Sequence, residues 1–441
     1  MVEQFLSHTS GAKMRVAHVA PSARSDTSAA WRIRKAQTKL GIDAFAMVHV
    51  GEESAKVHLM RRPGPLTNAK LNFEARLDGL PIRMSERPDA SLPWSSGWSG
   101  YKASRRIKRS GAEIVNLHWT TTGCIGLRDL HRLTIPVVMT LHDVWSVTGG
   151  CHCNLGCEGW REGCIACPQL TSGPFGLPLP EMLWKHKAIA YENIADLSVV
   201  SPSHWLAKMA IESGIFKQRQ VHVIRNCLDT ELFKPGTNPA FRQKHGISPD
   251  TTVMLFGAVN ALSTSYKGYD LLREALKVLP SLSLRRFHLV VFGSDGGLAD
   301  FPYPVTFLGH LNDEESLVAS YQAADIFVTP SRQDNYPSTV LEASACGIPS
   351  VGFDIGGIPE MIVHQQTGYV AGSFDVTDFA SGIAWISEDN KRRNYIGAQA
   401  RKLVERSSTE AIVANQYLDL YGATLTKDRN PIHLPTFLGT G

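Results

Sequence analysis

The chain has 441 residues, 43% of them hydrophobic and 20% charged, with a formal net charge of +4. Two domains are expected at this length, and the small charge argues against a nucleic-acid-binding protein. The sequence contains no apolar run of about 18 residues, the length that a membrane-spanning helix needs. Residues 1–13 lack the apolar core of a secretory signal. A cytoplasmic location is therefore predicted.

Alternating strand and helix signals begin near the N-terminus. Residues 14–20 are typical of a buried strand, and the polar segment 21–29 follows as a loop. A helix is predicted for 30–40, and Gly41 ends it. The order of strand, loop and helix is typical of the start of a Rossmann-like domain. Further strands are predicted at 44–48, 114–117, 136–141 and 197–200.

The same alternation restarts in the second half of the chain. Strands are predicted at 252–256, 288–292, 305–308, 326–329 and 350–353, with helices at 269–279 and 313–323. Two such series predict an α/β protein with two doubly wound, Rossmann-like domains facing a cleft. Ligands of these sheets bind at the carboxyl ends of the strands.

Two carboxylates stand at one such strand end. Asp334 lies in the loop after the strand 326–329, and Glu342 follows on a predicted helix, with seven residues between them. The free N–H groups of that helix terminus suit a phosphate, and the carboxylates can accept hydrogen bonds from sugar or ribose hydroxyls. The segment therefore predicts a nucleotide-sugar site.

This segment resembles the donor site of family 4 retaining glycosyltransferases, in which two acids separated by seven residues precede an Ala-x-x-x-Gly-x-Pro pattern. The residues that carry the resemblance are Asp334, Glu342, Ala343, Gly347 and Pro349. A second family pattern is matched within residues 221–235 by Ile224, Asn226, Asp229 and Phe233.

The resemblance implies the GT-B fold. Residues 14–215 would form an N-terminal acceptor domain with a cysteine-rich loop at 149–170. Residues 216–405 would form the donor domain, and a helix within 406–425 would cross back to the first domain. It also implies retention of the anomeric configuration, an NDP-sugar donor (UDP- or GDP-linked) and no catalytic metal.

The family's site roles carry over to individual residues. His142, Asp334 and Lys267 are implied as catalytic residues, and His118, Trp119 and Asp143 as acceptor contacts. The lysine would also neutralise the donor diphosphate. The implied donor-binding residues are Lys267, Glu342, Gly257, Asn335, Tyr336, Pro337, Ser338, Gly356 and Gly357.

Five of the eight cysteines lie between residues 151 and 167. Together with His142, Asp143 and Trp145, they resemble a bacterial exopolysaccharide and O-antigen branch of family 4. Four thiolates can bind zinc tetrahedrally, so a structural zinc site is one interpretation, and reduced thiols or disulfides are the other. The four cysteines that match the branch are Cys151, Cys157, Cys164 and Cys167.

Two departures from the family keep other functions open. No arginine follows Gly257, and the loop 22–28 lacks the family's glycine pair. A non-catalytic binder of nucleotide sugars or glycans is therefore one alternative to a transferase. A nucleotide-sugar epimerase of the same fold is a second alternative, because it would also use a UDP-sugar and acidic residues.

The branch implies a glycan or a lipid-linked oligosaccharide as acceptor. Trp94, Trp98 and Tyr101 precede the basic segment 102–109. Aromatic and basic side chains together can dock on anionic lipids, while a solvated helix face is the plain interpretation. A peripheral contact with the inner face of the plasma membrane is therefore one hypothesis for this segment.

Overall fold

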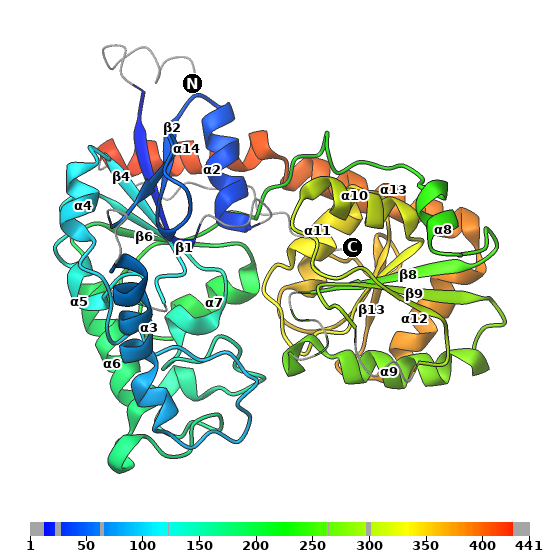
Figure 1. Cartoon of the computed structure of the whole chain (residues 1–441), viewed down its shortest axis with the longest axis horizontal. Helices are drawn as coiled ribbons and strands as arrows, with labels where there is room; N and C mark the ends of the chain where they lie inside the picture. The colour runs from blue at the N-terminus through cyan, green and yellow to red at the C-terminus, as the bar shows by residue number, and fades with distance from the viewer. Residues whose placement is uncertain are drawn as a thin grey trace.

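A computed structural model describes residues 13–22, 28–61, 66–121, 123–258, 260, 262, 264–296 and 301–426. They form two α/β domains that lie side by side (Figure 1). Each domain is built on a sheet of parallel strands, so the predicted architecture of two doubly wound domains is confirmed.

The first sheet has the strand order β3-β2-β1-β4-β5-β6-β7. The order reverses between β1 and β4, so the loops after these strands diverge and leave room for a ligand. The last strand, β7, lies beyond the predicted domain boundary at residue 215. The strands are β1 Arg15–Ser22, β2 Asp43–Val50, β3 Val57–Leu59, β4 Ile114–His118, β5 Val137–Thr140, β6 Leu197–Ser201 and β7 Val221–Val223.

The second sheet has the order β10-β9-β8-β11-β12-β13 and reverses between β8 and β11. Gly257 ends β8 and Asp334 follows β11, so both stand at this switch point. The strands are β8 Thr252–Gly257, β9 Phe287–Phe292, β10 Val305–Phe307, β11 Ile326–Thr329, β12 Ser350–Phe353 and β13 Gly368–Ala371.

The helices of the first domain surround its sheet (Figure 1). Helix α3 was not predicted, because only Asp78 and Ile82 of its residues are buried and no apolar stripe faces the core. The helices are α2 Ala29–Lys39, α3 Thr67–Arg83, α4 Ser104–Arg109, α5 Leu127–Leu130, α6 Leu179–Glu192 and α7 His204–Glu212, with 3₁₀ turns η1 Val144–Val147, η2 Gly159–Glu162 and η3 Pro174–Gly176.

The second domain ends in three successive helices. The last of them, α14, runs back over the first domain as predicted (Figure 1), and its Val413, Tyr417 and Tyr421 pack in one core with Val16 and Ile33. The helices are α8 Pro239–Lys244, α9 Tyr269–Val278, α10 Glu314–Ala323, α11 Ser338–Ala345, α12 Val376–Glu388, α13 Asn390–Ser407 and α14 Glu410–Thr426, with 3₁₀ turns η4 Ser265–Lys267, η5 Leu279–Ser281 and η6 Ile358–Glu360.

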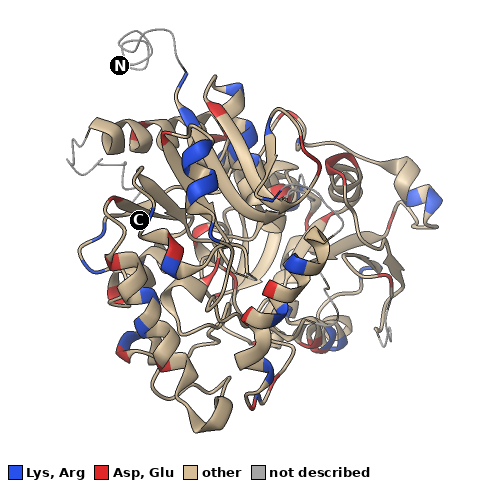
Figure 2. Ribbon diagram, turned by 60° about the vertical axis from the view of Figure 1, so that its left-hand side comes forward, with Lys and Arg blue, Asp and Glu red and all other residues tan. Residues whose placement is uncertain are grey.

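Charged residues of both signs are interspersed over the ribbon in the view of Figure 2. Within the described residues, no helix is both long enough and apolar enough to cross a membrane.

Candidate active site

Lys267 and Asp334 form the charged pair of the predicted donor site. Lys267 ends η4, directly before α9, and its Nζ lies 2.7 Å from Oδ2 of Asp334. Burial opposes the charge on Lys267, but the carboxylate and the neighbouring Tyr266 keep the pKa of the lysine above its usual value. The two side chains are 20% and 16% exposed, so a ligand can reach them.

Glycines allow the donor loops to pack tightly around this pair. A Cβ atom on Gly268 would lie 1.9 Å from the Pro330 carbonyl oxygen, and one on Gly356 would lie 2.1 Å from that of Asp334. Both glycines have positive φ, 71° and 58°. Gly357 donates its N–H to the carbonyl of Asp334 at 3.0 Å. In this structure the predicted glycine turn therefore holds the backbone of the Asp334 loop.

Asn335 and Glu360 join this loop to the first domain. The Asn335 amide donates to the carbonyl of His142 at 3.2 Å and accepts from the hydroxyl of Ser203. The Glu360 carboxylate accepts from the N–H groups of His204 and Trp205 in the first turn of α7. The two domains are therefore in direct contact at the predicted site.

His142 lies on the other side of this contact, two residues after the end of β5. Its ring stacks on that of Trp119 with centroids 3.9 Å apart, and its Nε2 lies 2.9 Å from Nδ1 of His118. Burial lowers the pKa of His142 to about 4, although nearby Asp143 opposes the shift. At neutral pH the ring is therefore uncharged.

Two of the predicted acceptor contacts have other partners. His118 is fully buried, and each of its ring nitrogens bonds to another histidine, so it supports His142 rather than facing an acceptor. Asp143 accepts from the N–H of Trp145 at 2.8 Å and bonds to His152 Nδ1 at 2.8 Å. These partners hold the turn η1, and with His142 they lower the pKa of Asp143 against the effect of burial.

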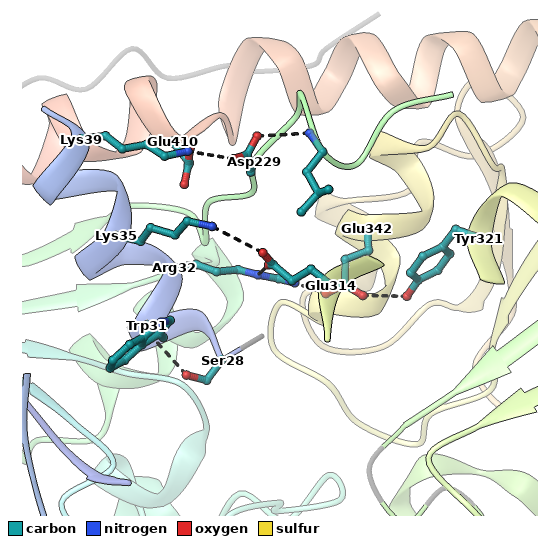
Figure 3. Close-up of polar contacts among 11 residues, drawn as sticks. Ser28, Trp31, Arg32, Lys35, Lys39, Asp229, Glu314, Tyr321, Glu342 and Glu410 are labelled. Carbon is teal, nitrogen blue, oxygen red and sulfur yellow. Dashed lines mark hydrogen bonds and ion pairs between the residues drawn. The ribbon is translucent and has the colours of Figure 1, made fainter. Parts of the chain in front are cut away.

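Glu342 is almost fully buried at the domain interface, in the second turn of α11. It accepts from Arg32 Nη1 at 2.7 Å and from the Tyr321 hydroxyl at 2.8 Å (Figure 3). Arg32 comes from α2 of the first domain and also pairs with Glu314 at 3.1 Å. The second acid of the motif is therefore held by an interdomain ion pair in this structure.

Arg32 was not predicted as a site residue. It lies on the predicted helix 30–40 with Lys35 and Lys39, at spacings of three and four that place the three cations on one face. That pattern indicates an acidic partner, but the partners Glu314, Glu342, Asp229 and Glu410 are distant in sequence.

The remaining predicted donor contacts lie at the start of α11. Pro337 is the residue before the helix, and Ser338 is its first residue. The side chain of Tyr336 instead points into the core, where its hydroxyl lies 3.2 Å from that of Ser408, so only the backbone of this residue is left for the predicted donor contact. Residues 23–27 and Val259 lie outside the described residues. The structure therefore does not place most of the loop 22–28, or part of the segment after Gly257 that lacks the family's arginine.

The four cysteines of the predicted zinc site line one small cavity of about 20 Å³. They are free thiols, and burial raises the pKa of Cys164 to about 11. Among the residues described, no three His, Cys, Asp or Glu side chains are placed to hold a metal ion. The prediction of a structural zinc site is therefore not supported.

Two protein-family models match consecutive parts of the chain. Residues 48–232 match the model "Glycosyltransferase Family 4", and residues 237–403 match "Glycosyl transferases group 1". The chain is 24% identical over 407 residues to a D-inositol 3-phosphate glycosyltransferase of Saccharomonospora viridis, which covers 88% of this chain and 86% of that protein.

Solved structures share the fold at low sequence identity. Sucrose-phosphate synthase of Thermosynechococcus elongatus superimposes with a TM-score of 0.66 at 16% identity, covering 94% of this chain and all of that one. HepE of Anabaena, solved with UDP and glucose, gives a TM-score of 0.63 at 14% identity, covering 93% of this chain and all of that one.

Proposed function

We propose that this chain, a GT-B glycosyltransferase of the group 1 and family 4 type, transfers the sugar of a nucleotide-sugar donor with retention and without a catalytic metal. The observation that carries this proposal is the pair of Lys267 and Asp334 beside His142. Asn335, next to Asp334 in the chain, bonds to the backbone carbonyl of His142, so one cation, one carboxylate and one neutral imidazole lie near the contact between the two domains.

Lys267 takes the donor diphosphate in this proposal. The ammonium group neutralises charge that develops on the leaving phosphate, as a fixed cation does in a desolvated site. The N–H groups at the start of α11 add a positive dipole end. Because these groups supply the electrostatic stabilisation, no divalent ion is needed.

Asp334 and His142 hold the transferred sugar. When a diphosphate binds Lys267, the Asp334 carboxylate loses its only side-chain cation partner among the described contacts and becomes available to a sugar hydroxyl. The leaving diphosphate takes the proton of the acceptor on the same face of the sugar, so the reaction requires no separate general base.

Glu342 binds the donor ribose in this scheme. Both of its oxygens already accept one hydrogen bond, from Arg32 and from Tyr321, and each carboxylate oxygen can accept another. The carboxylate is buried, so α2 and α11 must separate for the ribose to enter. Donor binding therefore involves a relative movement of the two domains.

Helix α3 supports a lipid-linked acceptor. Exposed Phe73, Leu77, Leu80 and Met84 recur at helical spacing along it. Its exposed cations are Lys70, Arg76 and Arg83. Its two carboxylates are engaged, that of Glu74 with Arg61 and that of Asp78 with Ser96.

An apolar row flanked by exposed cations suits an anionic lipid surface. We therefore place the membrane contact on α3. At the segment predicted for this contact, Trp94 is buried and Trp98 is 43% exposed. A phosphorylated polyol is the second candidate acceptor, because relatives of this chain carry the name D-inositol 3-phosphate glycosyltransferase.

A donor screen tests the proposal. The purified protein is incubated with UDP-, GDP- and ADP-sugars, with and without chelator, and release of the nucleotide is followed. Turnover of one donor that survives chelation supports the proposal, and loss of turnover on chelation contradicts it. Proton NMR of the product formed with a lipid-linked oligosaccharide or inositol phosphate then gives the acceptor and the anomeric configuration.

A further inference from the structure

Three histidines bond to one another beneath the candidate site. His18 lies in β1, His118 ends β4 and His142 follows β5, and these strands are neighbours in the first sheet. His18 Nδ1 lies 3.0 Å from His118 Nε2, and His118 Nδ1 lies 2.9 Å from His142 Nε2. The ring centroids are 5.3 Å and 5.2 Å apart. The three rings therefore form a continuous row that ends at the candidate site.

The row continues to the crossover helix. His18 Nε2 lies 2.9 Å from Oε1 of Gln37, and the Gln37 amide donates to the Tyr421 hydroxyl at 3.1 Å. His18, His118, Gln37 and Tyr421 are each at most 2% exposed. A path of buried hydrogen bonds thus leads from His142 to α14, which arrives from the other domain.

Each imidazole ring in the row is uncharged at neutral pH. Burial lowers the pKa of His18 to about 4 and that of His118 well below its usual value, as it does for His142. A neutral imidazole has one N–H and one acceptor nitrogen. Every bond between two rings therefore needs one donor and one acceptor, and all protons in the row must point the same way.

The Gln37 side chain sets that direction. Its Oε1 faces His18, so His18 carries its proton on Nε2 and accepts on Nδ1. His118 then donates from Nε2, and His142 donates from Nε2 to Nδ1 of His118. His142 is left with an unprotonated Nδ1, which can accept a hydrogen bond from a substrate hydroxyl.

We infer that His118, His18 and Gln37 are positioning residues that fix the tautomer and the orientation of His142. The inference rests on the proposed role of His142 in the transfer. Residues that do not contact the substrate thus determine which nitrogen of His142 can accept a hydrogen bond. Neither the sequence motif nor the family match indicates this dependence.

The experiment combines histidine ¹⁵N NMR with steady-state kinetics on the full-length protein. The resonances of His142 are assigned by their loss in His142→Gln. We expect one protonated and one unprotonated nitrogen, with a coupling across the N–H···N bond to His118. In His118→Phe, which keeps a ring but no nitrogen, the coupling disappears and the two shifts converge as both tautomers become populated.

The expected kinetic effect of His118→Phe is a fall in kcat of about 10- to 100-fold, as for residues that orient a functional histidine elsewhere, with little change in the donor KM. His118→Gln, whose amide can both donate and accept, should recover part of the rate. Tyr421→Phe keeps all three histidines and tests the same path should His118→Phe fail to fold. It should shift the His142 signals in the same direction.

Unchanged His142 signals in both His118→Phe and Tyr421→Phe would overturn the inference. Changed signals with an unchanged kcat would overturn the link to catalysis. A fully active His142→Gln would instead remove the proposed role of His142 itself, whatever the signals show. Failure of the inference and failure of the proposed function are therefore distinguishable.

Discussion

Arg32 and Glu342 join the two domains through a buried ion pair, with Nη1 and Oε1 2.7 Å apart and side chains 3% and 4% exposed. Arg32 bonds to Glu314 from the same guanidinium group (Figure 3). A helix of the first domain thus holds the second acid of the donor motif.

Removing Arg32 should destabilise the protein strongly. Arg32→Met leaves two buried carboxylates without their main cation, and breaking a buried pair costs about 3–5 kcal/mol. Urea denaturation measures the change. Lys35→Met is the matched control, because Lys35 is 41% exposed and pairs with the same Glu314 at 3.5 Å. The control should lose less than about 1 kcal/mol. Equal losses in the two variants would contradict the prediction.

Lys267→Ala should abolish most donor turnover. The variant loses the cation that we assign to the leaving diphosphate, and removal of one such electrostatic group lowers kcat by about 10²–10³-fold. Nucleotide release from the preferred donor measures it. Lys277→Ala, on the exposed face of α9, is the control and should keep the wild-type rate. A Lys267→Ala variant within threefold of wild type, on the order of 1 kcal/mol or less, would refute the assignment.

The buried histidines should make the fold sensitive to acid. The folded-state pKa values of His18 and His142 are about 4, below the usual 6.5. The unfolded chain therefore binds more protons between these values, and stability is lost as the pH falls from about 6.5 toward 4.

For each pH unit of acidification in this window, each buried histidine lowers the free energy of unfolding by up to about 1.4 kcal/mol. Urea unfolding at pH 7, 6 and 5 should give a shallower pH dependence for His18→Phe than for wild type. His131→Gln, at an exposed position, should leave the slope unchanged. An identical slope in His18→Phe would show that His18 does not titrate differently on folding.

Apolar residues of α3 should be required for binding to anionic vesicles. Burial of one large apolar side chain contributes about 1.5–3 kcal/mol, so Phe73→Glu combined with Leu77→Glu should weaken binding by at least about 10²-fold. Co-sedimentation with vesicles containing phosphatidylserine measures it. Leu284→Glu changes a leucine that is 99% exposed in the other domain and should bind as wild type does. No loss in the α3 variant would exclude this surface.

The parallel sheets and the positions of the main candidate donor residues could be predicted from the sequence. Continuous apolar runs such as 252–256 and 326–329 indicate strands buried on both faces, and these became β8 and β11. Because ligands bind at strand ends in such sheets, the sequence also placed Asp334 and Lys267 correctly relative to the strands. Helix α3 was not predicted because most of its apolar residues face outward, and only Ile82 among them is buried in a core.

The contacts of these residues, by contrast, could not be predicted from local patterns. Arg32 and Glu342 are separated by 310 positions, and His18 and His118 by 100. A local pattern shows that a residue is charged or polar, but its partner is chosen when two sheets and the crossover helix α14 pack together. The ion pair at the domain interface and the histidine row beneath His142 are therefore properties of the folded chain, since burial both brings these groups together and lowers the pKa of the histidines.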